Sequence, residues 1–232
     1  MREAIESLLP LERNLFFALN GSDSLFLDHL MWTVSGRLIW IPLFLAIIFL
    51  FFYRTPRKEA FLVTFFFVLV FVLSDQVSSS FFKPLFERFR PTYHPAFKDL
   101  VDIVNGYRGG RYGFISGHAT SSFGLAVFLS LLFRHRGLIL TALFWATLNS
   151  YTRIYLGVHF ISDIVAGMLV GTLLAFLLYR LMKILESRLL AVHTASGDHC
   201  YSHKQGYCLT LFILLYLFLL IVFSPLLASL PH

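Results

Sequence analysis

The chain has 232 residues, of which 57% are hydrophobic and only 14% are charged, and its mean hydropathy is +0.74. This composition excludes a soluble globular domain. The formal net charge is +6. In a membrane protein, the distribution of this charge between the two faces of the membrane indicates the orientation of the chain.

Residues 1–35 mix acidic, basic and apolar residues at roughly helical spacing, with Glu6, Glu12 and Arg13 among the charged ones. This pattern is typical of amphipathic helices that lie in the membrane interface. Acidic residues precede the apolar ones and no long apolar core follows a basic start, so we expect no cleaved signal peptide. Residues 1–35 are predicted to form an N-terminal interfacial segment.

Several later stretches approach the ~20 apolar residues that a helix needs to cross a membrane. The fold class is therefore predicted to be all-α, a polytopic membrane helical bundle with about six transmembrane helices. Residues 36–182 would form a core of five spans, and residues 183–232 a polar loop with a C-terminal span. The six stretches are 38–53, 61–77, 119–133, 138–152, 160–182 and 209–228.

With six crossings, the 78–118 loop and the 153–159 turn share one face of the membrane, and the 54–60 and 134–137 connections share the other. Lys and Arg near helix ends orient a membrane protein more strongly than net charge does. Both short connections are basic, so their face is expected to be cytoplasmic and the 78–118 loop to face outward. The basic residues are Arg54, Arg57, Lys58, Arg134 and Arg136.

The polar loop before the last span gathers three histidines and a cysteine, His193, His199, Cys200 and His203. Their spacing fits no standard zinc pattern, so a solvated loop is favoured and no metal site is predicted. Cys200 lies in a loop expected in the reducing cytoplasm and Cys208 begins a span, so no disulfide is expected.

Polar residues gather on the outward face in three separate segments, which the alternating direction of the helices brings together. The first is "KPLFERFRP", the second is "SGH" at the start of the third span, and the third is "TRIYLGVHFISD" between the fourth and fifth spans. They carry Lys83, Arg90, Ser116, Gly117, His118, Arg153, His159 and Asp163.

Each of these residues also has an ordinary structural explanation. Lys83 and Arg90 suit basic side chains that snorkel at helix ends. Ser116 suits an N-cap, and His159 with Asp163 suits a helix-face pair of small energetic value. Their occurrence together, with complementary chemistry on one face, favours a functional site.

The cations Lys83, Arg90 and Arg153 would stabilise a dense anion such as phosphate. Unsatisfied N–H groups at the start of the third span point to the same anion, and Gly117 lets that backbone approach closely. The sequence therefore predicts a phosphate-binding site.

Two histidines complete a phosphoryl-transfer site. Asp163, four residues after His159, can hold one ring nitrogen as N–H and leave the other free to attack. We therefore expect His159 to be the nucleophile and His118 to handle the proton of the leaving group.

These motifs resemble the signature of the membrane-bound phosphatidate phosphatase superfamily, the lipid phosphate phosphatases, related in motif to acid phosphatases and vanadium haloperoxidases. That signature is Lys, six residues, Arg-Pro; then Pro-Ser-Gly-His; then Ser-Arg, five residues, His, three residues, Asp. The first element matches in full, whereas Ile115 replaces Pro in the second and Thr152 replaces Ser in the third. The resemblance covers about residues 35–182.

The resemblance implies a phosphohistidine intermediate on His159, protonation of the leaving group by His118, and neither metal nor cofactor. It also implies that the partner is a membrane lipid phosphate and not a nucleic acid: phosphatidate, phosphatidylglycerol phosphate, undecaprenyl diphosphate or a lipid A phosphate. The phosphate would be held by Lys83, Arg90, Ser116, Gly117 and Arg153.

With the short chain, the resemblance also implies a bacterial inner membrane, so the outward face that the basic connections predict for the site would be the periplasmic one. The 92–114 loop is expected to shape the headgroup pocket. Its residues 107–111 suit either further phosphate contacts or a solvated loop. The sequence does not specify the oligomeric state.

Two other functions are open at this point. "GFISG" at 113–117 resembles the Gly-x-Ser-Gly pattern of rhomboid intramembrane proteases, with one residue more, and would make Ser116 a nucleophile. A serine protease, however, has no use for three cations around its serine. A non-catalytic anion or lipid binder would explain the cations, but not the Asp163 that follows His159 by one helical turn.

Overall fold

The computed structural model describes residues 2–189 and 201–229. Over these ranges the chain is helical, without a strand, and one isolated antiparallel bridge joins Phe89 and Tyr112. The helices are α1 (Arg2–Glu6), α2 (Leu9–Leu19), α3 (Leu25–Ser35), α4 (Ile41–Phe52), α5 (Arg57–Gln76), α6 (Lys83–Phe86), α7 (Gly117–Phe133), α8 (Arg136–Tyr155), α9 (Ile161–Leu189) and α10 (His203–Leu227). Shorter helical segments are η1 (Leu38–Trp40), η2 (Val77–Phe82), η3 (Pro91–Tyr93) and η4 (Val104–Gly106).

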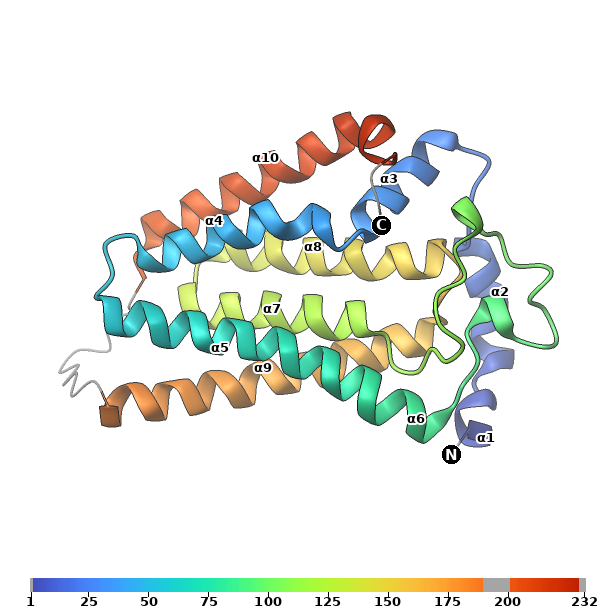
Figure 1. The fold of residues 1–232 in the computed structure, drawn as a ribbon, viewed down its shortest axis with the longest axis horizontal. Coiled ribbons are helices and arrows are strands. Elements are labelled where there is room, and N and C mark those ends of the chain that lie inside the picture. Colours follow the sequence, from blue (N-terminus) through green and yellow to red (C-terminus); the bar gives the residue numbers. More distant parts are fainter. Residues whose placement is uncertain (1, 190–200, 230–232) are drawn as a thin grey trace.

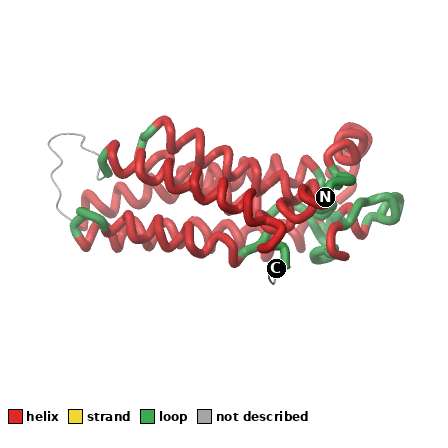
Figure 2. The backbone as a smooth tube through the Cα atoms, turned by 90° about the horizontal axis from the view of Figure 1, so that it is seen from above, coloured by secondary structure: helices red, strands yellow, loops and turns green. Residues whose placement is uncertain are grey.

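The long helices run side by side along one direction, and α1 and α2 lie across one end of the bundle (Figures 1 and 2). The centre of the bundle is α7, in which eleven of the seventeen residues are buried. It packs against α5, α8 and α9, while α10 covers α3, α4 and α8 on the other side. The prediction of an all-α membrane bundle is confirmed.

Three segments are long and apolar enough to cross a membrane: Arg57–Phe86, Ile161–Arg188 and His203–Leu227. They coincide with three of the predicted spans, and Gly117–Phe133 is a shorter apolar helix. The predicted number of six crossings is therefore approximate.

The first predicted span, residues 38–53, is preceded by a second apolar helix that the sequence analysis did not assign to it. The helix pair Leu25–Ser35 and Leu38–Phe52 is apolar enough to form a fourth crossing, but it is bent by 71° at the break. It has the shape of a broken span or a re-entrant loop. The end of the segment assigned to the interface thus leads directly into the first span, and the domain division at residue 35 stays a prediction.

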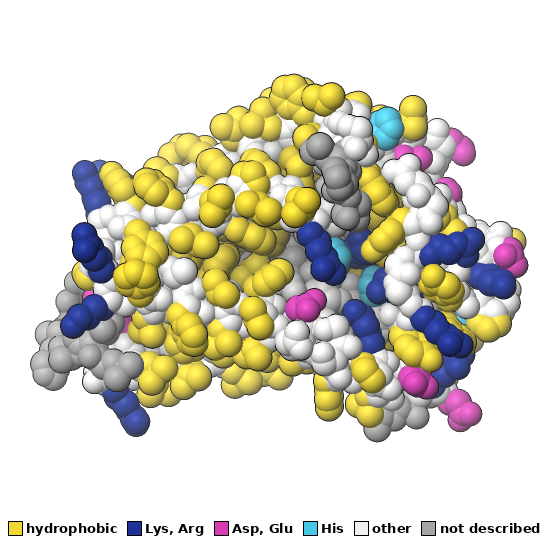
Figure 3. Space-filling view, viewed as in Figure 1, with side chains coloured by type: hydrophobic (Ala, Val, Ile, Leu, Met, Phe, Trp, Pro, Cys, Tyr) yellow, Lys and Arg dark blue, Asp and Glu magenta, His cyan; other side chains and the backbone are white. Residues whose placement is uncertain are grey.

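The outer surface matches the membrane setting. Figure 3 shows a broad hydrophobic band over the middle of the bundle and basic side chains at both ends. Exposed hydrophobic side chains of the long helices include Phe49, Phe65, Leu140 and Leu169. Water-soluble proteins rarely expose so large an apolar surface, so this band is suited to contact with lipid.

Close packing of α7 on α9 fixes the relation between two parts of the predicted site. A Cβ atom at Gly171 would overlap the carbonyl group of Thr120, and one at Gly167 would lie 2.8 Å from the Ser116 carbonyl oxygen. Small residues four apart allow two membrane helices to approach closely. The approach holds the start of α7 against the start of α9, where His118 and Asp163 lie.

Candidate active site

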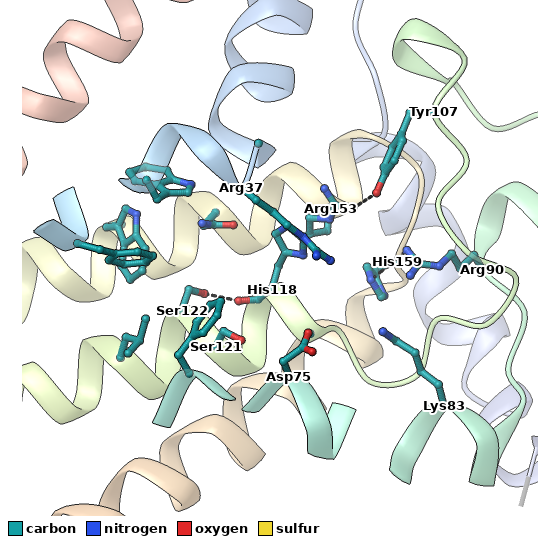
Figure 4. A pocket seen from close by; sticks show the side chains of 18 residues that line it. Arg37, Asp75, Lys83, Arg90, Tyr107, His118, Ser121, Ser122, Arg153 and His159 are labelled. Carbon is teal, nitrogen blue, oxygen red and sulfur yellow. Dashed lines mark hydrogen bonds between the residues drawn. The ribbon is translucent and has the colours of Figure 1, made fainter. Parts of the chain in front are cut away.

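A cavity of about 250 Å³ lies at the end of the bundle where α6 and α8 end and α7 begins. In Figure 4, His118 and His159 border the same space, into which Arg37, Arg153 and Lys83 extend. Six of the predicted site residues line the cavity: Lys83, Arg90, Gly117, His118, Arg153 and His159. The tertiary structure therefore brings all three motifs together.

His159 lies in the turn between α8 and α9, and its two ring nitrogens have different partners. Its Nδ1 is 3.3 Å from Asp163 Oδ2, and its Nε2 is 3.3 Å from Arg90 Nη1. A guanidinium can only donate, so Nε2 must accept the hydrogen bond and the ring proton must be on Nδ1. The electron pair of Nε2 therefore faces the cations, as a nucleophile at this position requires.

Burial lowers the pKa of His159 well below its ordinary value, and the nearby charges of Arg90, Arg153 and Lys83 lower it further. Both effects disfavour the protonated ring. His159 is therefore neutral at physiological pH.

His118 lies in the first turn of α7, across the cavity from His159. Its Nε2 is 3.3 Å from the backbone oxygen of Ser35, at the end of α3. Because a carbonyl oxygen only accepts, Nε2 carries a proton in this hydrogen bond and Nδ1 is the nitrogen available for proton transfer. The predicted proton donor is thus oriented by the segment just before the α3–α4 bend.

The cavity is strongly cationic. Four cations and one carboxylate line it: Arg37, Lys83, Arg90, Arg153 and Asp75. Burial, and then the charge of Arg153, lower the pKa of Arg90 to about 10, which still leaves it charged at neutral pH. Arg90 and Arg153 are the buried members of this cluster, and an excess of positive charge of this kind is stabilised by a dense anion such as a phosphate dianion.

Arg153 carries unused donors within this cluster. Its Nη2 donates to Tyr107 Oη at 3.0 Å, but its Nε and Nη1 have no partner among the described residues. Burial would raise the pKa of the Tyr107 phenol, but Arg153 and Arg90 lower it overall. Tyr107 belongs to the 107–111 run, for which the sequence left phosphate contact or solvation open, and it lines the cavity.

Ser116 and Gly117 stand at the start of α7, where the backbone N–H groups are not used within the helix. Ser116 is fully buried, and its Oγ accepts from Ala119 N, so it has the N-cap geometry that was the ordinary explanation for it. Gly117 lines the cavity, and a Cβ atom there would lie 2.9 Å from Ser78 Oγ. A side chain at this position would therefore have to displace the Ser78 hydroxyl of η2.

The most extensive polar network behind the site centres on Arg88, a residue that sequence analysis did not single out. Arg88 Nη1 donates to Asp163 Oδ1 at 2.8 Å, and Nη2 donates to Glu12 Oε1 at 2.6 Å. Glu12 also accepts from the backbone N–H of Ser162 at 2.7 Å. The guanidinium lies 4.4 Å from the centre of the Phe160 ring.

The effect of this network is to fix the carboxylate that orients His159. Asp163 accepts from Arg88 on one oxygen, and from the Phe160 N–H and the His159 ring on the other. Arg88 lies within "KPLFERFRP", so its position in a motif was a usable signal. Glu12 comes from α2, 150 residues before Ser162, and no local pattern connects the two.

The structure also adds residues to the lining of the cavity that the sequence did not indicate. Asp75 on α5 and Arg37 at the α3–α4 bend line the cavity near His118 (Figure 4). Trp145 and Asn149 on α8 line the inner part. Each of them lies outside the three motifs.

The last feature of the site is its set of side chains that could bind a metal ion. Within residues 2–189 and 201–229, no three His, Cys, Asp or Glu residues are grouped as a metal site would require. Of the histidine and cysteine cluster considered above, His193, His199 and Cys200 lie outside the described residues, and His203 begins α10.

Comparison with known families decides the class of the protein. The sequence model of the PAP2 superfamily matches residues 65–186, which is more than half of the chain. The chain belongs to the PAP2 superfamily. The resemblance inferred from its three motifs is thereby confirmed.

Named relatives of this PAP2 chain are bacterial. The lipid A 4′-phosphatase of Porphyromonas gingivalis is 42% identical over 202 residues, which cover 87% of this chain and 83% of the relative. The lipid A 4′-phosphatase of Bacteroides thetaiotaomicron is 40% identical over 186 residues, which cover 80% of this chain and 83% of the relative. The expectation of a phosphatase acting on lipid phosphates is confirmed, and the serine protease alternative is dropped.

Solved structures of PAP2 proteins share the fold. The PAP2 type phosphatidylglycerolphosphate phosphatase from Bacillus subtilis has a TM-score of 0.57 at 22% identity, covering 79% of this chain and 88% of its own. Aquifex aeolicus LpxE has a TM-score of 0.53 at 24% identity, covering 73% of this chain and 95% of its own. The membrane helical bundle is therefore that of this superfamily.

Proposed function

We propose that the chain hydrolyses the phosphate ester of a lipid A-type glycolipid through a phosphohistidine intermediate on His159. The substrate is suggested by two relatives named lipid A 4′-phosphatase, at 42% and 40% identity. The observation that carries the mechanism is the geometry of His159, whose Nδ1 faces Asp163 and whose Nε2 faces Arg90 at 3.3 Å. A neutral ring beside an excess of cations is suited to attack on a bound phosphate.

In the first half of the reaction, the substrate phosphate takes the hydrogen bonds of Lys83, Arg90 and Arg153, which frees His159 Nε2. Its electron pair forms a bond to phosphorus while the bond from phosphorus to the lipid oxygen breaks. His118 gives that oxygen a proton. The cations stabilise the charge on the transferring group, which is the main contribution that a protein makes to phosphoryl transfer.

In the second half, water attacks the phosphorus of phosphohistidine and passes a proton to His118. The nitrogen–phosphorus bond breaks, its electron pair returns to His159, and inorganic phosphate leaves. Asp163 accepts a hydrogen bond from the Nδ1–H of His159 throughout and stabilises the positive ring that forms on phosphorylation. No step requires a metal ion.

The site is proposed to open on the periplasmic face of a bacterial inner membrane. Support comes from the basic connections before α5 and before α8, which lie at the opposite end of the bundle from the cavity (Figures 1 and 3). Basic connections favour the cytoplasm. The substrate would then be a lipid whose phosphate already faces outward.

Cysteine labelling tests this orientation. In a chain lacking Cys200 and Cys208, single cysteines at Lys98 and at Arg136 place a thiol on exposed positions at opposite ends of the bundle. An impermeant thiol reagent on spheroplasts should label Lys98→Cys but not Arg136→Cys. The reverse pattern would place the site in the cytoplasm.

The reaction itself is tested by phosphate release from purified protein in detergent. The panel contains lipid A, phosphatidylglycerol phosphate, phosphatidate and undecaprenyl diphosphate, and lipid A should be the best substrate. His159→Ala should remove many orders of magnitude of rate, because uncatalysed phosphate ester hydrolysis is extremely slow. Substantial turnover by His159→Ala would place the nucleophile elsewhere.

Vanadate separates an enzyme from a non-catalytic lipid binder. It mimics the five-coordinate transition state of phosphoryl transfer, so it should inhibit the native chain strongly. Phosphate release that is insensitive to vanadate, or strict dependence on added magnesium, would contradict the mechanism.

A further inference from the structure

The cavity is larger than the phosphate group that its cations would hold. A cavity of about 10–15 Å³ is enough to hold one water molecule, so a volume of about 250 Å³ has room for much more than one phosphate group. A phosphate has one phosphorus and four oxygens. The remaining space lies on the inner side, where aromatic and aliphatic side chains form the wall: Trp40, Phe44, Phe71, Leu125 and Trp145.

Three polar side chains on α8 line this same cavity at intervals of four residues, Trp145, Asn149 and Arg153. Residues with this spacing share one face of a helix and are separated by about 6 Å along its axis. They are 5%, 6% and 1% exposed, respectively. Together they form a polar row that runs inward from the phosphate site.

Each member of this row has a polar atom without a hydrogen-bond partner in the described part of the chain. The atoms are Trp145 Nε1, Asn149 Oδ1, and Nε and Nη1 of Arg153. Buried polar groups are nearly always paired, because an unpaired one has lost its bond to water without replacement. The substrate phosphate accounts for Arg153 but not for the other two, which lie about 6 and 12 Å further inward along α8.

We propose that Asn149 and Trp145 form a polar subsite for an amide or hydroxyl group of the substrate, located next to the leaving oxygen. This inference rests on the proposed function and deepens it. Trp145 Nε1 only donates, whereas the side chain of Asn149 both donates and accepts. A secondary amide satisfies both residues, because its oxygen accepts from Trp145 and its N–H donates to Asn149 Oδ1.

The subsite selects between classes of lipid phosphate. An N-acylated sugar phosphate carries an amide a few bonds from its phosphate and a hydrocarbon chain beyond it, which suits Asn149 followed by the aromatic wall. An isoprenyl phosphate presents only hydrocarbon there and would leave both polar groups buried and unpaired. Sites built to bind a polar group reject analogues that lack it.

The test compares kcat/KM for two soluble probes that differ in this group, a short-chain N-acyl glucosamine 4-phosphate and geranyl phosphate. The variants are Asn149→Leu and Trp145→Phe, of which the second removes the indole N–H together with the five-membered ring and keeps a six-membered aromatic ring. Thr147→Val is the matched control, because Thr147 lies exposed on another face of the same helix. Elution as a single species in detergent checks folding.

In both variants, the preference for the N-acyl sugar phosphate over geranyl phosphate should fall about tenfold or more, which corresponds to one hydrogen bond to a buried group. Thr147→Val should keep the native preference. Equal losses on both probes, or an unchanged preference, would overturn the subsite while leaving the proposed function intact. No phosphate release from either probe or from lipid A by the native chain would instead overturn the proposed function.

Discussion

Replacing Arg88 by methionine tests whether the network behind His159 holds the catalytic geometry. The side chains of Arg88 and Asp163 are fully buried, and that of Glu12 is nearly so. Methionine is also unbranched and flexible, but it has no charge and no N–H group. Arg88→Met therefore leaves two buried carboxylates without their shared partner.

The size of the effect follows from this burial. Breaking a buried ion pair by removing one partner costs about 3–5 kcal/mol, because the remaining charge stays buried. Here two carboxylates lose the same partner, so we expect the upper part of that range. Asp163 also loses the hydrogen bond of 2.8 Å that fixes its orientation toward His159. A misplacement of about 1 Å in a catalytic group lowers the rate by roughly 100-fold, which is the loss expected in kcat.

The assay pairs chemical unfolding in detergent micelles with phosphate release. The double variant Arg88→Met/Glu12→Gln separates charge from simple loss of packing, since it removes one of the two unpaired carboxylates. It should be at least about 1 kcal/mol more stable than Arg88→Met. Arg136→Met is the control, because Arg136 is exposed at the opposite end of the bundle.

Three results would refute this reasoning. Native kcat in a folded Arg88→Met protein would mean that Asp163 needs no support. A double variant that is no more stable than Arg88→Met would mean that the carboxylates are not the source of the cost. A rise in KM alone, with kcat retained, would assign Arg88 to substrate binding instead of positioning.

Three further predictions concern the orienting carboxylate, the pH profile and the helix packing. Asp163→Asn should lower kcat by less than His159→Ala does, because it misorients the ring without deleting it; equal losses would contradict that role. Because burial and neighbouring cations lower the pKa of His159, the acid limb of kcat/KM should lie below pH ~6.5, the ordinary histidine value. Burial and the charge of Arg153 lower the pKa of His118 as well, so the rate should fall, as His118 loses its proton, from a pH that also lies below the ordinary histidine range, and the bell should be narrow; a monotonic rise through the histidine range would contradict the two roles. Gly171→Ala should destabilise the bundle by about 1–3 kcal/mol in detergent unfolding, since the new methyl group overlaps the Thr120 carbonyl; native stability would show that α7 and α9 can separate without cost.

Much of the site could be predicted from the sequence because its residues occur in short motifs at helix ends. The spacing from Lys83 to Arg90, and from Arg153 through His159 to Asp163, is local information. Alternating helix direction then places the motifs on one face without any knowledge of packing. The roles of Arg90 and Arg153 as phosphate ligands follow from their charge and need no coordinates to be proposed.

Other features could not be predicted, for identifiable reasons. Glu12 was assigned to an interfacial helix because its neighbours alternate with apolar residues, yet it is buried against Arg88. A pattern of charges does not say which charge meets a partner from a distant segment. The break between α3 and α4 was missed because a bend of 71° leaves no mark on hydropathy.

The sequence by itself determined the membrane setting, the helical class and the residue types of the proposed phosphate site, since each depends on composition or on residues close together in the chain. Only the tertiary structure decided what surrounds that chemistry. Glu12 reaches Arg88 because α2 lies across the end of the bundle. Asn149 and Trp145 line the cavity because α8 turns that face inward. Such contacts depend on how helices pack, and packing is set by the shapes of many distant side chains together.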